Sequence, residues 1–357
     1  YEIRLSLVGS EMCIRDSSLS SIAARVCGVG ILVLPLGAEP PAASPAPANS
    51  VDALQVEVQR VFEQARPAVV RIVGVDVHGP LSGSGFFVDP NGTLLTAYTI
   101  GGEANELTVE LGNRKYPARR ICADARSGIA LLKVEAQTPF LTPVQGDALP
   151  GVASAVVAVG YPVDLDATPS FGIVAGHDRK YLGRFFSTTH IRANVPVQRG
   201  QGGAPLLNLK GEVVGVLIST VDNGTACFVL PIQAAEKVRA NSVRFGDARH
   251  GWLGLTVESV AGSVRVAQVL PKSPAEGSGL RSGDVLQAVG KRAVQSPEDV
   301  LDASFFLTSG EPVEVQVMRD GALQTLTLVP ADPPGKPALH AGEPASFRGG
   351  PLLIRSE

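Results

Sequence analysis

The chain has few aromatic residues, few cysteines and no marked excess of either charge. Aromatic residues make up 5% of its 357 residues, there are four cysteines and five histidines, and the formal net charge is −3. This charge, together with the lack of a basic stripe or an interleaved aromatic pattern, argues against a nucleic-acid partner. Neither an H-E-x-x-H nor a C-x-x-C motif occurs, so the sequence indicates no metal site and no cofactor.

Glycine and proline, in contrast, are abundant. The 39 glycines and 27 prolines favour short strands joined by many turns over a helical protein. Helical spacing predicts one helix over residues 51–65, which ends before Pro67, and a second over residues 231–240. Strands are expected between them, at residues 69–75, 85–88, 94–97, 107–111, 129–134, 155–159, 171–175, 188–193, 205–208, 212–219 and 227–230. This pattern suits two small antiparallel barrels.

The first fifty residues differ in composition from the rest. Residues 1–17 resemble translated sequencing-adaptor sequence, and we exclude them from functional reasoning. Residues 18–38 contain an apolar run of the right length for a signal-peptide core, so an exported, periplasmic or extracytoplasmic protein is expected. The alternative is an uncleaved N-terminal anchor, which would be the only contact with a membrane. Residues 39–50 read as a Pro/Ala linker.

Three motifs stand in a fixed order in the β-rich region. Residues 83–96 read G-S-G-F-F-V-D-P-N-G-T-L-L-T, residues 127–134 read S-G-I-A-L-L-K-V, and residues 200–206 read G-Q-G-G-A-P-L. In order and spacing they resemble the motifs of trypsin-fold proteases of the HtrA/Deg type. The resemblance implies a chymotrypsin-like double antiparallel β-barrel over residues 51–245. It places Thr99 at the general-base histidine, Gly128 at the orienting aspartate and Gly202 at the nucleophilic serine.

These three replacements remove the chemistry that the motifs normally carry. A serine hydroxyl becomes nucleophilic only when an imidazole takes its proton, and that imidazole needs a carboxylate to orient it. Glycine has no side chain, and the hydroxyl of Thr99 is too weak a base near neutral pH. The sequence therefore predicts a pseudoprotease, in which only the backbone N–H groups of Gly200 and Gly202 remain as an oxyanion loop. His177 and His190 lie on strands that could approach the cleft, but neither has a motif-spaced partner.

The C-terminal part carries a second resemblance, to the PDZ domains of HtrA-type proteases. Residues 252–255 read W-L-G-L, like a carboxylate-binding loop, and residues 270–286 resemble the S-P-A-x-x-A-G-L-x-x-G-D-V-I core. The domain is expected over residues 246–333, followed by a disordered tail at 334–357. The resemblance implies that a peptide adds as a strand beside residues 263–269, and a capping box at Ser296 predicts a helix to about residue 307. The peptide-binding residues are then expected to be Trp252, Leu253, Gly254, Leu255, Val264 and Val266.

Two functions follow from these resemblances. The first is an exported scaffold, chaperone-like adaptor or regulator that binds peptides or unfolded C-termini through the PDZ domain. The second is an active HtrA-like serine endopeptidase in envelope protein quality control, with its catalytic residues elsewhere in the chain. The family implies a homotrimer, and mixed oligomers with active relatives are the alternative. Cys122 and Cys227 are expected in different barrels, as buried free thiols.

Overall fold

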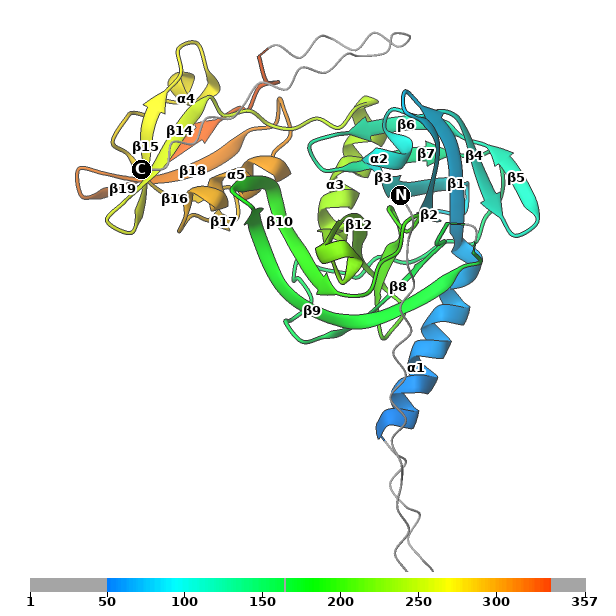
Figure 1. Ribbon diagram of the computed structural model, residues 1–357. Coiled ribbons are helices and arrows are strands. Elements are labelled where there is room, and N and C mark those ends of the chain that lie inside the picture. Colours follow the sequence, from blue (N-terminus) through cyan, green and yellow to red (C-terminus); the bar gives the residue numbers. More distant parts are fainter. Residues whose placement is uncertain (1–49, 164, 335–357) are drawn as a thin grey trace, which may run out of the picture. The chain divides into compact units, whose positions relative to one another are not determined.

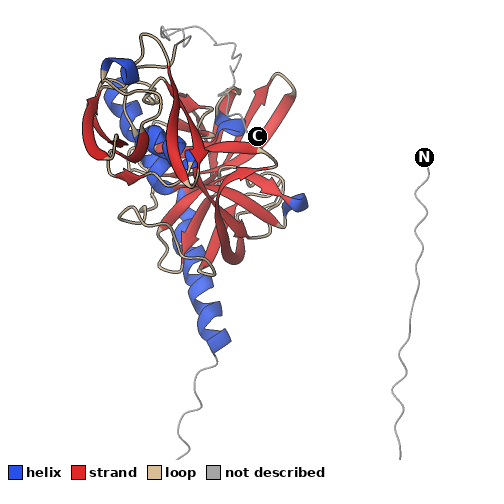
Figure 2. Ribbon diagram, turned by 90° about the vertical axis from the view of Figure 1, so that its left-hand side faces the viewer, coloured by secondary structure: helices blue, strands red, loops and turns tan. Residues whose placement is uncertain are grey.

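The computed structural model describes residues 50–163 and 165–334. The expected adaptor segment, signal segment, linker and C-terminal tail lie outside these residues. The described chain is dominated by antiparallel strands, with two long helices and three short ones (Figure 2). No helix among the described residues is long and apolar enough to cross a membrane.

The first β domain is a seven-stranded antiparallel sheet preceded by a helix (Figure 1). The helix α1 (Ser50–Ala65) ends before Pro67, as predicted, and its residues Val61 and Ala65 are buried against the core. The sheet runs in the order β5-β4-β1-β2-β3-β7-β6. Its strands are β1 (Val69–Asp76), β2 (Gly79–Phe87), β3 (Thr93–Ala97), β4 (Asn105–Leu111), β5 (Arg114–Pro117), β6 (Arg119–Asp124) and β7 (Ile129–Lys133), and the one-turn helix α2 (Tyr98–Gly101) follows β3.

The second β domain is a closed barrel in the order β10-β13-β12-β11-β8-β9. Its strands are β8 (Ala155–Gly160), β9 (Thr168–Tyr181), β10 (Arg184–Asn194), β11 (Pro205–Asn208), β12 (Val213–Val221) and β13 (Ala226–Pro231). The helix α3 (Ile232–Phe245) follows and ends at Gly246, which takes the left-handed conformation typical of a helix terminus. Both predicted helices are thus present, and the fold is mostly β as expected.

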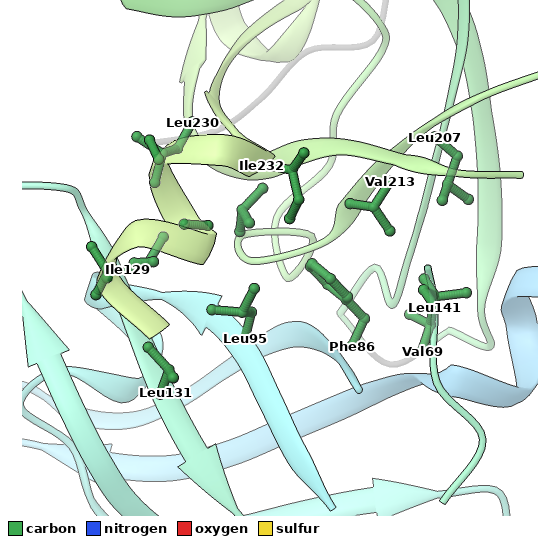
Figure 3. Close-up of a cluster of buried hydrophobic side chains, with 14 of the residues drawn as sticks. Val69, Phe86, Leu95, Ile129, Leu131, Leu141, Leu207, Val213, Leu230 and Ile232 are labelled. Atoms are coloured by element: carbon green, nitrogen blue, oxygen red, sulfur yellow. The ribbon is translucent and has the colours of Figure 1, made fainter. Parts of the chain in front are cut away.

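Apolar side chains from both β domains meet in one buried cluster (Figure 3). Phe86, Leu95 and Ile129 come from the first sheet, Leu207 and Val213 come from the second barrel, and Ile232 comes from α3. All six are at most 1% exposed. Burial of this much apolar surface is the main force that joins the two sheets.

A smaller antiparallel β-sheet completes the described chain. It runs in the order β14-β15-β16-β18-β19, with β17 paired to β16. Its elements are β14 (Leu255–Val260), β15 (Ser263–Val269), α4 (Pro274–Gly277), β16 (Val285–Val289), β17 (Arg292–Ala293), α5 (Pro297–Phe306), β18 (Val313–Arg319) and β19 (Ala322–Leu328). The predicted capping box is present at Ser296, which opens α5.

The sequence missed some strands and misjudged the bounds of others. The strand β5 was not expected, and β2 begins six residues before the predicted strand at 85–88. The strand β6 contains Cys122, as its strand-like context indicated. The missed strand β5 carries exposed or half-exposed residues, so it lacks the alternating apolar pattern on which strand prediction depends. The prediction for the cysteines is confirmed, since Cys122 and Cys227 are buried and free.

Candidate functional site

The backbone brings the three positions that the resemblance equates with the catalytic triad to one place between the β domains. The N–H of Tyr98, next to Thr99, donates a 2.7 Å hydrogen bond to the carbonyl oxygen of Gly128. A Cβ atom built on Gly202 would lie 3.8 Å from Cγ1 of Ile100, the residue after Thr99. Thr99 lies in α2, Gly128 lies in the turn before β7, and Gly202 lies in the loop before β11. The three motifs therefore converge in space as well as in order.

The backbone conformations at two of these positions would tolerate different side chains. Gly128 has φ +78, a left-handed conformation that side chains other than glycine rarely adopt. Gly202 has no such constraint, and a Cβ atom there would meet only Ile100, at ordinary contact distance. A serine would fit at position 202 without strain, whereas an aspartate at position 128 would not.

Ser84 fixes the loop that contains Gly202. Its N–H donates to the carbonyl oxygen of Gly202 at 2.8 Å, and its hydroxyl donates to the carbonyl oxygen of Gly200 at 2.9 Å. The same hydroxyl accepts a 2.8 Å hydrogen bond from the N–H of Tyr161. Ser84 is fully buried and belongs to β2 of the first sheet, so one side chain ties the loop to the other β domain.

The other polar backbone groups of this loop are also largely paired. The carbonyl oxygen of Arg199 accepts from the N–H of Val163 at 2.9 Å, and that of Gln201 accepts from the N–H of Ala204 at 3.1 Å. The N–H groups of Gln201 and Gly203 donate to the carbonyl oxygens of residues 198 and 217. Within the described residues, the N–H groups of Gly200 and Gly202 are left without an acceptor.

Gly200 and Gly202 both line a pocket of about 370 Å³. Its walls come from the loop at residues 197–202 and from the end of β12. The described lining residues include aliphatic side chains, one arginine and no acidic residue or histidine: Val197, Gln198, Arg199, Gly200, Gly202, Leu217, Ile218, Ser219, Thr220, Asn223 and Gly224. The pocket thus offers hydroxyls but no imidazole to activate them.

Neither of the two histidines that could have approached the cleft, His177 and His190, is among the described residues that line this pocket. Nε2 of His177 lies 2.9 Å from the carbonyl oxygen of Pro150. His190 is 3% exposed, with its Nδ1 atom 2.7 Å from the carbonyl oxygen of Thr188. Burial lowers the pKa of His190 to about 4, so this imidazole is neutral near pH 7.

One imidazole does pair with a carboxylate, away from the pocket. Nε2 of His250 lies 2.8 Å from Oδ2 of Asp124, and Nδ1 lies 3.4 Å from the carbonyl oxygen of Phe305. Both ring nitrogens face acceptors, so neither can take a proton from a serine. Burial alone would raise the pKa of the Asp124 carboxyl, but the hydrogen bond and charge of His250, with the hydrogen bond from Ser127, lower it. The pair is structural and was not anticipated from the sequence, because its members lie 126 residues apart.

The strand order corrects the expected position of a bound peptide. The strand β15 (Ser263–Val269) is paired on both sides, with β14 and β16, so no peptide can add beside it. Val264 and Val266 are 1% and 0% exposed and belong to the core of this sheet, not to a groove. The two edge strands in this order are β14 and β19, and of these β14 directly follows the loop at residues 252–255 and lies next to α5.

The expected carboxylate-binding loop has a suitable backbone. The N–H of Trp252 donates to the carbonyl oxygen of Ala331, but those of Leu253 and Gly254 find no acceptor in the part of the chain that the structure describes. Gly254 has φ +77, and a Cβ there would come within 2.2 Å of Cβ of Ser273. Glycine is therefore required at the tip of this loop.

No metal site is indicated. Within residues 50–163 and 165–334, no group of three or more His, Cys, Asp or Glu side chains could hold a metal ion.

Comparison with known proteins assigns the two parts of the chain. Residues 83–216 match the trypsin-like peptidase domain family, and residues 251–329 match the PDZ domain family. A "Probable periplasmic serine endoprotease DegP-like" from Ectopseudomonas mendocina (strain ymp) is 33% identical over 285 residues, which cover 74% of this chain and 60% of the relative. A protein of the same name from Pseudomonas fulva (strain 12-X) is 32% identical, with the same coverage of both chains. The chain thus spans about 60% of the length of these relatives.

Solved structures show the same fold. An "HtrA-type protease AlgW with tripeptide" has a TM-score of 0.68 at 22% identity, over 78% of this chain and 98% of that chain. A serine endoprotease from Yersinia pestis has a TM-score of 0.60 at 23% identity, over 77% of this chain and 97% of that chain. The chain therefore belongs to the HtrA/DegP-type family, in which a trypsin-like serine protease domain is followed by a PDZ domain.

Proposed function

We propose that this protein is a non-catalytic HtrA-like scaffold that binds peptides or unfolded C-termini through its PDZ domain. The observation that carries the proposal is the convergence of Thr99, Gly128 and Gly202 where the three motifs meet. None of these residues supplies an imidazole, a carboxylate or an activated hydroxyl. The left-handed backbone at Gly128 supports the proposal further, since the acid position no longer suits an aspartate.

Peptide binding is supported by the loop and strand edge of the PDZ domain. The unpaired N–H groups of Leu253 and Gly254 are suitable donors for a terminal carboxylate. A peptide could then extend along the free edge of β14, with α5 as the other wall. Main-chain hydrogen bonds would supply affinity, and the side chains of the groove would supply selectivity.

We also propose an exported protein that acts outside the cytoplasm as an adaptor or regulator. The two relatives that are 33% and 32% identical to it are named probable periplasmic endoproteases. A homotrimer, or a mixed oligomer with active relatives, is part of this proposal and rests on the family resemblance.

The second candidate function is an active serine endopeptidase of the cell envelope. It is favoured by the names of the relatives and by the loop at Gly200–Gly202, whose two N–H groups are free as an oxyanion hole requires. Under this alternative, a hydroxyl in the pocket such as that of Ser219 would have to find a base that the structure does not place there.

Fluorophosphonate labelling separates the two functions. We expect the full chain to remain unlabelled and to leave denatured casein uncut, while a peptide with a free C-terminus binds it. The variant Ser219→Ala is the matched control for adventitious labelling in the pocket. Covalent capture of a serine in the unmodified chain, lost on a single serine-to-alanine change, would establish the endopeptidase and reject the scaffold.

A further inference from the structure

The loop that has lost its nucleophile keeps two backbone donors, and nothing in the proposed function uses them. The N–H groups of Gly200 and Gly202 are the only ones between residues 200 and 204 that lack an acceptor within the described chain. A planar trans peptide directs its N–H opposite to its carbonyl group. The carbonyl oxygens of Arg199 and Gln201, which share peptides with these two N–H groups, are held by Val163 and Ala204. The two donors are thus fixed by their own hydrogen-bonded peptides.

The charges around these donors suit an anion. Arg199 lies on the pocket lining, and none of the described lining residues is acidic. With glycine at position 128, the carboxylate that an aspartate would bring to this cleft is also missing. A negative ligand here meets backbone dipoles and one cation, without a like charge from the described lining to repel it.

The space around Gly202 also admits a second oxygen atom. A Cβ at this position would meet nothing nearer than Ile100, at 3.8 Å, so there is room where a serine side chain would stand. Beyond it, the lining of the pocket of about 370 Å³ includes three aliphatic residues, Val197, Leu217 and Ile218. An apolar side chain of moderate size fits such a wall better than a charged one.

We propose that the vacated cleft binds the C-terminal carboxylate of a peptide, with one carboxylate oxygen on the N–H groups of Gly200 and Gly202 and the last, aliphatic side chain in the pocket. This inference rests on the proposed absence of catalysis, because an active enzyme would hold a scissile carbonyl here instead. The protein then has two sites for chain ends, one in the PDZ domain and one in the trypsin-like domain.

The test uses the full chain and two fluorescein-labelled heptapeptides that end in Ala-Ala-Leu, one with a free carboxylate and one with a terminal amide. The variant Leu255→Asp places a negative charge in the PDZ loop and closes that site to carboxylates. By fluorescence anisotropy, we expect this variant to keep binding the free acid and to bind the amide about tenfold more weakly, as expected for the loss of a charge-assisted hydrogen bond. Equal binding of acid and amide would overturn the inference, as would loss of all binding.

Further variants assign the remaining binding to the cleft. Adding Gly202→Leu to Leu255→Asp should abolish binding, because the leucine side chain would fill the space beside the two N–H groups. Because Gly202→Leu could disturb folding, the exposed Arg199 offers a second approach, and Arg199→Glu should weaken binding about tenfold through charge alone. Unchanged binding by Arg199→Glu would overturn the inference. Casein cleavage by the same preparations would instead overturn the proposed function, so the two failures are distinguishable.

Discussion

At the scale of single residues, glycines in and near one cleft have different requirements. Gly200 has φ +94, and a Cβ there would lie 2.7 Å from the carbonyl oxygen of Tyr161 and 2.8 Å from the N–H nitrogen of Val163. Gly128 has a left-handed backbone, and a Cβ there would make only ordinary contacts with Ile218, at 3.5 Å or more. Gly202 has neither a left-handed backbone nor a clash. The backbone conformation at position 202 therefore does not require glycine.

The loss in the free energy of unfolding should therefore differ between substitutions of these three glycines. We expect Gly202→Ser to change the free energy of unfolding by about 0.5 kcal/mol or less, since the site is open. Gly128→Asp should cost about 1–2 kcal/mol from left-handed strain, and Gly200→Ala should cost more, because strain and a backbone clash combine. Urea unfolding of the three variants measures this order. A Gly202→Ser variant less stable than Gly128→Asp would contradict it.

Restoring the triad should consequently give little activity. The triple variant Thr99→His, Gly128→Asp and Gly202→Ser places the right groups on the family frame, but the strained position 128 works against a properly oriented aspartate. We expect casein hydrolysis to rise above the double variant without Gly128→Asp by less than about 10⁴-fold, the loss seen when a triad aspartate is replaced. A larger rise would show that the backbone at position 128 adapts freely.

His190 gives the protein a defined sensitivity to acid. Burial lowers its pKa from 6.5 to about 4, so the folded state holds this group neutral at pH values where the unfolded chain protonates it. Its contribution is fully present above pH 6.5 and is lost as the pH falls toward 4, by up to about 3 kcal/mol. Urea unfolding at pH 7 and pH 4.5 should show this loss in the unmodified protein and a smaller one in His190→Gln. Equal losses in both proteins would refute this role of His190.

At the scale of elements, a single serine on β2 organises the loop before β11. Ser84 is fully buried and bonds Gly202, Gly200 and Tyr161, so the first sheet positions a loop of the second barrel. The conformation of the cleft therefore depends on contact between two β domains and not on the loop alone.

Removal of the Ser84 hydroxyl should lower the stability of the protein. Ser84→Ala leaves the N–H of Tyr161 and the carbonyl oxygen of Gly200 buried without partners, which we expect to reduce the free energy of unfolding by about 1–3 kcal/mol. Ser82→Ala, on the same strand but partly exposed, is the matched control and should change it by about 0.5 kcal/mol or less. Equal effects in chemical denaturation would mean that Ser84 does not hold the loop.

At the scale of the whole molecule, the buried pair of Asp124 and His250 connects β6 with the segment that precedes the PDZ domain. His250 is 6% exposed and also packs against Phe305, with ring centroids 4.9 Å apart. Removing one member of such a pair leaves the other buried and uncompensated.

Asp124→Asn should therefore destabilise the protein by about 3 kcal/mol at pH 7. The double variant Asp124→Asn with His250→Gln should lose less than the sum of the two single variants, because the partners interact directly. Thermal and urea unfolding of the four proteins forms a double-mutant cycle. Strict additivity would show that the two side chains act independently.

Prediction from sequence succeeded where motifs fix local structure. The two antiparallel β domains, both long helices of the trypsin-like part, the capping box at Ser296 and the buried free thiols follow from turn residues, periodicity and order along the chain, although only the second domain is a closed barrel. It failed for the peptide edge of the PDZ domain, because local strand pattern does not reveal which strand has an unpaired side. The polar strand β5 was missed for the related reason that its partner β4, and not apolar alternation, holds it in place.

The chain's residues by themselves determined the family and the side chains at positions 99, 128 and 202, on which the proposed loss of catalysis rests, since folding cannot add an imidazole or a carboxylate to a threonine or a glycine. Only the tertiary structure decided which backbone groups remain available in the cleft. The hydroxyl of Ser84 and the carbonyl oxygen of Gly200 lie 116 residues apart in sequence, yet their contact helps to set the direction of the whole loop. The availability of a donor depends on all its potential partners, and those are brought together by the packing of two β domains.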